Sequence, residues 1–149
     1  MPVAEGLTLP FDSPDSIRSD LLERIDYQGG DQLIRYHTPE WSCVCPFSGL
    51  PDFGSFYMTY VPAHHIVELK SLKYYLVSYR PVGIYQELAT TRLLTDLWQL
   101  LGPVYLQVDT VYRPRGGIHA HCTQTNGTFP SHLRDRLAIS PAPTEGPCL

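Results

Sequence analysis

Alternation of apolar and polar residues predicts four β-strands along the chain. The clearest is Phe53–Val61, where Phe56, Met58 and Tyr60 share one face and polar side chains occupy most of the other. The other predicted strands are Gln32–Thr38, Val104–Tyr112 and Ile118–Thr123. Such alternation is typical of an antiparallel sheet that is covered on one face only.

Between the predicted strands Phe53–Val61 and Val104–Tyr112 the apolar residues recur at helical spacing. Leucines recur at helical intervals from Glu87 to Leu101, and Gly102 follows the last of them, as at many helix ends. A shorter helix is expected from Ser71 to Tyr79, preceded by a short strand at Ile66–Glu68. The order ββααββ predicts an α+β fold in which both helices cover one face of an antiparallel sheet.

The length of 149 residues fits one domain, which we expect to span residues 17–138. Residues 1–16 and 139–149 each contain three prolines and no periodicity, so we expect both segments to be flexible and outside the core.

Charge and composition exclude several classes of protein. A net charge of −4 argues against a nucleic-acid partner, because such domains usually carry a basic face. No apolar run reaches the ~20 residues of a membrane span, and the N-terminus lacks the features of a secretory signal. The four cysteines are unevenly spaced and do not suggest a disulfide framework, so we expect a cytoplasmic protein.

The segment from Cys45 to Gly54 offers a nucleophile and an acid. Pro46, Gly49 and Pro51 favour a turn that folds Asp52 back towards the thiol. A thiol beside an acid can add sulfur to an electrophilic carbon and protonate the atom that gains charge. The plainer interpretations are that Cys45 is a small buried apolar residue and that Asp52 caps a turn.

Two further blocks carry positive charge suited to phosphates. The first, Glu68–Arg80, includes Lys70 and Lys73, and the second places Arg115 before Gly116-Gly117, where backbone can approach a phosphate closely. The glycine fingerprint of Rossmann dinucleotide sites does not occur.

Three motifs in this order resemble those of a known enzyme family, and the resemblance runs from about Glu40 to Gly127. The family is the NADPH-dependent 7-cyano-7-deazaguanine reductases, the nitrile reductases of queuosine biosynthesis, which belong to the tunnelling-fold superfamily. The matching motifs are Cys45-Pro46 with Gly49-Leu50-Pro51-Asp52, then Glu68-Leu69-Lys70-Ser71-Leu72-Lys73-Tyr74, and Pro114-Arg115-Gly116-Gly117-Ile118.

The resemblance implies a role for each matched residue. Cys45 would add to the nitrile carbon to form a thioimide, and Asp52 would protonate the nitrogen. The deazapurine would bind to Val67, Glu68, Leu69, Gln86 and Glu87. NADPH would bind to Leu69, Lys70, Lys73, Arg115 and Gly116.

The resemblance also implies a homo-oligomer, two stacked pentameric rings with sites at the subunit boundaries. A physical argument points the same way: a four-stranded sheet exposes two edges, and a ring of subunits would pair them all in a barrel.

Two positions depart from the family pattern. Gln86 stands where the family commonly has His, so any proton transfer by that His is in doubt, whereas orientation of the base by Glu87 is not. The plainer role of Glu87 is to complement the dipole of its helix. Cys43 stands where the family usually has a small hydroxyl residue, and we expect it to pack.

Other functions stay open. His119 and His121 share a strand face and could chelate zinc as in a cyclohydrolase, but a pair lacks the third ligand typical of catalytic zinc, so we expect no metal. An amidine-forming relative would keep Cys45 and Asp52 but lack the lysine block that this chain has. A non-catalytic module that binds a purine or pterin would need neither residue.

Overall fold

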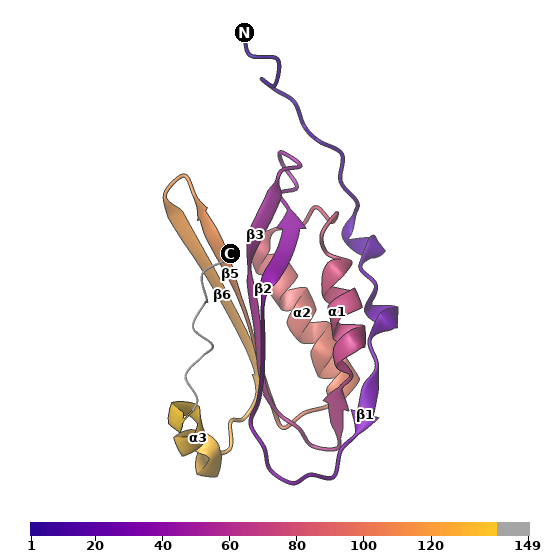
Figure 1. Ribbon diagram of the computed structural model, residues 1–149, viewed down its shortest axis with the longest axis vertical. Helices are drawn as coiled ribbons and strands as arrows, with labels where there is room; N and C mark the ends of the chain where they lie inside the picture. The colour runs from indigo at the N-terminus through magenta and orange to yellow at the C-terminus, as the bar shows by residue number, and fades with distance from the viewer. Residues whose placement is uncertain (140–149) are drawn as a thin grey trace.

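The computed structural model describes residues 1–139 and contains one main sheet with two long helices packed against it (Figure 1). The strands are β1 (Arg24–Asp26), β2 (Ile34–Val44), β3 (Pro51–Val61), β4 (His65–Val67), β5 (Tyr105–Arg115) and β6 (Ile118–Gly127). The α-helices are α1 (Leu69–Val77), α2 (Gln86–Leu101) and α3 (Arg134–Ile139), and short 3-10 turns lie at Pro14–Ser16, Ser19–Leu21 and Ser131–Leu133.

The main sheet is antiparallel, with strand order β2-β3-β5-β6. Helices α1 and α2 cover one of its faces, and the short α3 lies on the opposite side (Figure 1). The predicted ββααββ arrangement is therefore confirmed. Strands β2 and β6 are the two edges of the sheet, which is where the ring argument places the neighbouring subunits.

The core forms where the apolar face of the sheet meets the helices. Phe56, Met58 and Tyr60 on β3 are almost completely buried, as the alternation predicted, and Leu93 and Leu97 of α2 pack over them in the same cluster. Burial of such a side chain stabilises the fold by about 1.5–3 kcal/mol. Helix α2 ends at Gly102, whose left-handed φ of 51° glycine adopts without strain.

Strand β2 is longer than predicted. The predicted end at Thr38 precedes a proline, which cannot donate to a ladder, yet the strand continues to Val44. A register shift between Thr38 and Trp41 accommodates Pro39 as a bulge, after which pairing with β3 resumes. The continuation brings Val44 opposite Pro51, so the Cys45 turn is a tight connection rather than a long loop.

The short β4 belongs to a second sheet, in which it pairs with β1 in antiparallel register. Helix α1 begins at Leu69, two residues before the predicted Ser71, because Glu68 caps its first turn. No helix within residues 1–139 is long and apolar enough to cross a bilayer.

All side chains of residues 1–16 are exposed, in agreement with their expected place outside the core. Their backbone is nevertheless tied to the domain, because the N–H of Asp12 donates to the carbonyl of Pro81 at 2.8 Å. Of the predicted flexible C-terminal segment 139–149, residues 140–149 lie outside the described residues.

Candidate active site

Cys45 opens the tight turn that joins β2 to β3. Its N–H donates to the carbonyl of Leu50 and its carbonyl accepts from the N–H of Gly49, both at 2.9 Å. Gly49 has a φ of +75°, a region that L side chains rarely adopt, so the turn requires a glycine here. The turn thus holds the Cys45 thiol at the end of the sheet.

The turn lowers the pKa of the Cys45 thiol. Partial desolvation raises that pKa, but hydrogen bonds from the Ser48 hydroxyl and from the backbone of Ser48 and Phe47 outweigh it. Donors aimed at the sulfur stabilise the thiolate, which is the nucleophilic form. The role of Ser48 was not predicted, because it depends on how the turn folds.

Cys43, in contrast, is completely buried. Burial raises the pKa of its thiol to about 12, so it stays protonated at neutral pH. Its sulfur lies 3.9 Å from the hydroxyl of Tyr112 and 4.0 Å from the carbonyl of Ile84. The expectation that Cys43 packs is confirmed. Cys43, Cys45 and Cys122 are free thiols, and Cys148 lies outside the described residues.

Asp52 lies on β3, opposite Cys43, with only 6 % of its surface exposed. It forms an ion pair with Arg115, which lies at the end of β5. The hydrogen bond to Asp52 is the main cause that raises the pKa of Arg115, and Cys45 adds to it. The charge of Asp52 in turn tends to raise the pKa of the Cys45 thiol, so the turn does bring the predicted acid near the predicted nucleophile. The pairing of Arg115 with Asp52 was not predicted.

The start of α2 lies at the same end of the sheet. The N–H of Val44 donates to Val82 at 2.9 Å, and that of Ile84 donates to Val44 at 3.1 Å, so residues 82–84 run beside the end of β2. Helix α2 follows at Gln86, with Glu87 in its first turn. The structure therefore brings Gln86 and Glu87 to the end that carries Cys45, Asp52 and Arg115, which we call the turn end.

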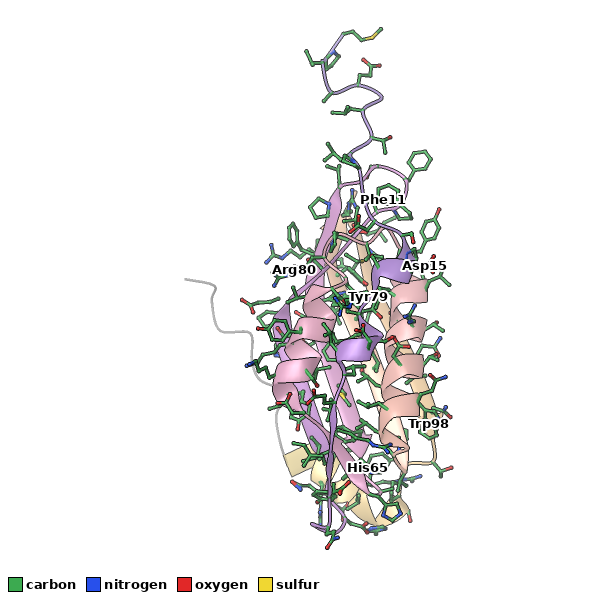
Figure 2. All side chains as sticks on the ribbon, turned by 90° about the vertical axis from the view of Figure 1, so that its right-hand side faces the viewer. Phe11, Asp15, His65, Tyr79, Arg80 and Trp98 are labelled. Carbon is green, nitrogen blue, oxygen red and sulfur yellow. The ribbon has the colours of Figure 1, made fainter. Side chains whose placement is uncertain are left out.

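Val67, Glu68, Leu69 and Lys70 lie at the opposite end. The N–H of Val67 donates to the hydroxyl of Tyr60, and Tyr60 lies nine positions along β3 from Pro51. At a strand rise of 3.3 Å, nine residues span about 30 Å. His65 of β4 and Phe11, whose ring lies against Gly83, accordingly lie towards opposite ends of the sheet and helices (Figure 2).

Glu68 is the N-cap of α1. Its two carboxylate oxygens accept from the N–H groups of Lys70 and Ser71 at 2.8 and 2.7 Å. These bonds lower the pKa of Glu68 and keep it ionised. Each oxygen has a second lone pair, so the cap leaves capacity to accept a bond from a ligand. The side chain of Val67 is buried in the core, which leaves only its backbone for a ligand.

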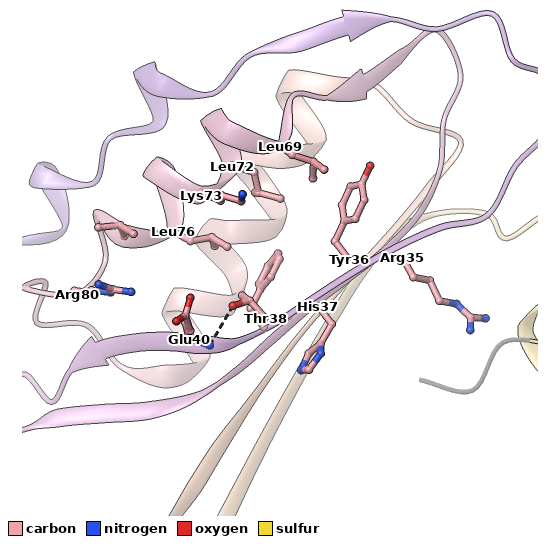
Figure 3. A pocket seen from close by; sticks show the side chains of 12 residues that line it. Arg35, Tyr36, His37, Thr38, Glu40, Leu69, Leu72, Lys73, Leu76 and Arg80 are labelled. Carbon is pink, nitrogen blue, oxygen red and sulfur yellow. Dashed lines mark hydrogen bonds between the residues drawn. The ribbon is translucent and has the colours of Figure 1, made fainter. Parts of the chain in front are cut away.

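A groove of about 420 Å³ runs between α1 and the edge strand β2 (Figure 3). Leu69, Leu72 and Leu76 line it from α1. Lys73 and Arg80 bring positive charge to the same groove, while Lys70 lines a separate hollow beside Glu68. The two predicted cofactor lysines thus face different hollows of the chain.

His119 and His121 lie on the exposed strand β6. His121 bonds to Asp109 at 3.0 Å, and the Thr123 hydroxyl donates to the same carboxylate oxygen at 2.5 Å. Within the described part of the chain no group of three His, Cys, Asp or Glu residues could hold a metal ion. The absence of a resident metal stays a prediction.

Comparison with known proteins identifies relatives of this chain. Residues 51–130 match the family described as QueF-like protein. An NADPH-dependent 7-cyano-7-deazaguanine reductase of Thermotoga maritima is 54% identical over 119 residues, which is 79% of this chain and 87% of the relative. Proteins of the same name from Thermoanaerobacter pseudethanolicus and Staphylococcus aureus are 45% and 41% identical, covering 70% and 81% of this chain and 80% and 74% of the relatives.

A solved structure confirms the likeness in fold. The crystal structure of the archaeosine synthase QueF-Like in the apo form aligns with a TM-score of 0.61 at 24% identity, over 66% of this chain and 96% of the other. At this identity the likeness concerns the fold alone. The family match and the identities to curated relatives go further: the chain belongs to the QueF-like family, together with NADPH-dependent 7-cyano-7-deazaguanine reductases.

Proposed function

We infer that this chain is an NADPH-dependent oxidoreductase that reduces the nitrile of 7-cyano-7-deazaguanine to the aminomethyl group, a step of queuosine biosynthesis. The observation that carries the proposal is the turn end itself. There a thiol of lowered pKa lies beside a buried carboxylate, in a chain whose relatives at 41–54% identity carry that name. Simple binding of a purine would require neither group.

The proposed chemistry begins with Cys45. The thiolate adds to the nitrile carbon, one C–N π bond breaks, and the nitrogen takes a proton, which gives a covalent thioimide. Asp52 supplies that proton. Because Asp52 is ion-paired with Arg115, it can act as an acid only after it has itself taken up a proton.

Two molecules of NADPH, bound in turn, would supply one hydride each, and these with one further proton would reduce the thioimide to the amine and free Cys45 as the thiolate. The chain has residues that fit this dinucleotide. Leu69 is 46 % exposed, and the groove beside it gathers the charges of Lys73 and Arg80 next to apolar surface. Phosphates need such positive charge, and a nicotinamide or adenine ring needs apolar contact.

The predicted substrate residues fall into two groups about 30 Å apart, from the spacing along β3. One bicyclic base cannot contact Cys45 and Glu68 of a single chain. A neighbouring copy that brings its Glu68 end to the turn end would complete the site. This supports the proposal of a homo-oligomer with sites at subunit boundaries, for which the family resemblance implies two stacked pentamers.

The amidine-forming alternative is less well supported. The archaeosine synthase shares the fold at 24% identity, whereas the reductases are up to 54% identical. The lysine block with Lys70 and Lys73 is also present in full. A cytoplasmic location and the absence of nucleic-acid and membrane partners stay predictions.

The proposal is tested by mixing the protein with 7-cyano-7-deazaguanine and following the oxidation of NADPH by its nicotinamide absorbance. Intact-mass spectrometry without NADPH should show the protein plus one nitrile. The variant Cys45→Ala should lose both signals with an unchanged circular dichroism spectrum, because Cys45 is on a surface turn. Turnover by Cys45→Ala would refute the thioimide, and ammonia incorporation without NADPH oxidation would favour the amidine-forming alternative.

A further inference from the structure

Residues 9–12 cross the turn end of the molecule, although they lie outside the core. The N–H of Leu9 donates to the carbonyl of Ser48 at 3.1 Å. At Asp12 the N–H donates to Pro81 at 2.8 Å and the carbonyl accepts from Gly83 at 2.9 Å. We call Leu9–Asp12 the N-terminal strap. Upstream of it, the bonds from Glu5 to Pro2 and from Leu7 to Ala4 are local.

The strap lies so close to its neighbours that two of them must be glycines. A Cβ on Gly49 would lie 2.2 Å from the carbonyl oxygen of Leu9. A Cβ on Gly83 would lie 2.2 Å from a ring carbon of Phe11. Gly83 has an ordinary φ, so the close approach of Phe11, rather than the backbone conformation, is what requires a glycine there. Real side-chain contacts do not come this close, and the strap is therefore packed against its neighbours rather than merely adjacent to them.

The contacts of the strap lead to Cys45 along two routes. The first is direct, since Ser48 and Gly49 belong to the turn that Cys45 opens. The second runs through residues 81–84, which lie between Asp12 and Val44. Asp12 forms a parallel bridge with Val82, and Val44 forms one with Gly83. Val44 is the last residue of β2 and precedes Cys45. The strap therefore contacts the Cys45 turn and, through residues 81–84, the end of β2 from which that turn begins.

We propose that the N-terminal strap is a positioning element of the active site, which holds the Cys45 turn in the conformation that attacks the nitrile. The proposal rests on the function inferred above. Within the turn, Ser48 is the residue that links the strap to the nucleophile: its carbonyl accepts from Leu9, while its hydroxyl and N–H lower the pKa of Cys45. A loosened strap would free Ser48 to turn away from the sulfur.

The full-length variant Gly83→Ala tests the proposal, because the three atoms nearest to its new methyl group all belong to the ring of Phe11, which the methyl group would displace. We expect the rate of adduct formation with 7-cyano-7-deazaguanine to fall about tenfold to a hundredfold, the scale of a small misplacement of a reacting group. The double variant Phe11→Ala/Gly83→Ala removes the clash and should recover much of the loss. Phe11→Ala alone serves as the matched control and should be nearer to wild type.

A second readout does not depend on the nitrile. The rate of alkylation of Cys45 by iodoacetamide, measured against pH by peptide mass spectrometry, gives the pKa of the thiol. A variant that lacks residues 1–12 should show this inflection at higher pH than wild type, whereas one that lacks residues 1–7 should not. Circular dichroism and the melting temperature check that each variant is folded.

The outcomes separate the two proposals. If wild type forms no nitrile adduct, the inferred function fails, and the alkylation profile still decides the role of the strap. If wild type forms the adduct and Gly83→Ala forms it as fast with the same alkylation inflection, the strap is not a positioning element. If the truncated chain does not fold, the comparison of Gly83→Ala with the double variant gives the answer.

Discussion

Mixed oligomers of two inactive variants should regain activity, provided that each variant damages a different end of the molecule. Cys45→Ala removes the nucleophile at the turn end. Glu68→Gln removes the charge of the proposed substrate acceptor at the other end, while its amide oxygen can still cap α1. Tyr60 lies nine positions along β3 from Pro51, a span of about 30 Å, so one base cannot contact both positions in one chain.

The size of the recovery follows from the arrangement. If a site takes its Cys45 from one chain and its Glu68 from a neighbour, then random mixing in equal amounts leaves about one site in four with both residues intact. We therefore expect about a quarter of the wild-type rate of NADPH oxidation. Co-expression of the two variants with different affinity tags, followed by purification on both tags, yields the mixed oligomers.

A matched control uses two variants at the same end. Cys45→Ala mixed with Asp52→Asn should gain nothing, because the turn end of any one chain then lacks one of the two residues. Two results would refute the reasoning. One is a mixture of Cys45→Ala and Glu68→Gln that is no more active than its parents. The other is a Glu68→Gln variant that is fully active by itself, which would leave Glu68 only its role as a helix cap.

Three further predictions concern single residues. Asp52→Asn should slow turnover about 10²-fold, because an amide cannot deliver a proton, and a wild-type rate would assign the acid to another group. Ser48→Ala should raise the pKa of Cys45 by about one unit, since a hydrogen bond to a charged group contributes about 1.5 kcal/mol at a partly exposed site. The rate of adduct formation, which rises with pH as the thiolate forms, should then reach its plateau at higher pH. An unchanged inflection would contradict the role of Ser48. Lys70→Ala should raise KM for NADPH about tenfold and leave KM for the nitrile unchanged. Arg115→Ala should also slow adduct formation, because Arg115 pairs with Asp52. A Lys70→Ala variant that changed only the KM of the nitrile would remove Lys70 from the cofactor site.

Hydrophobic periodicity predicted β3, β5 and both long helices because each of these elements buries one regular face, whereas β6 is largely exposed. It was less accurate where something other than burial decides the structure. Strand β2 continues past Pro39 because a bulge leaves this residue without a partner on β3, so the backbone N–H that proline lacks is not required for pairing. Strand β1 has three exposed residues and is held by its pairing with β4, so it carries no pattern of its own.

The site was predicted to a similar extent. Cys45 and Asp52 are seven positions apart, and turn residues between them are enough to predict that they meet. The partner of Asp52 is Arg115, 63 positions further on, and only the register of β3 with β5 brings the ends of these strands together. The strap could not be predicted either, because its attachment is made by backbone atoms, which every sequence shares.

The position of Arg115 also explains how the turn end can hold two anions. A Cys45 thiolate beside an ionised Asp52 would be unfavourable, and the electrostatic effect of Asp52 on the thiol is indeed to raise its pKa. Arg115 interacts with both Asp52 and Cys45, and each of these groups raises the pKa of the Arg115 guanidinium. The cation therefore offsets the repulsion between the two anions, which leaves the donors of Ser48 and Phe47 free to lower the pKa of the thiol. On this view Arg115 would serve the chemistry of the nitrile as much as the phosphates of NADPH, while the lowered pKa of Cys45 comes from the donors of the turn itself.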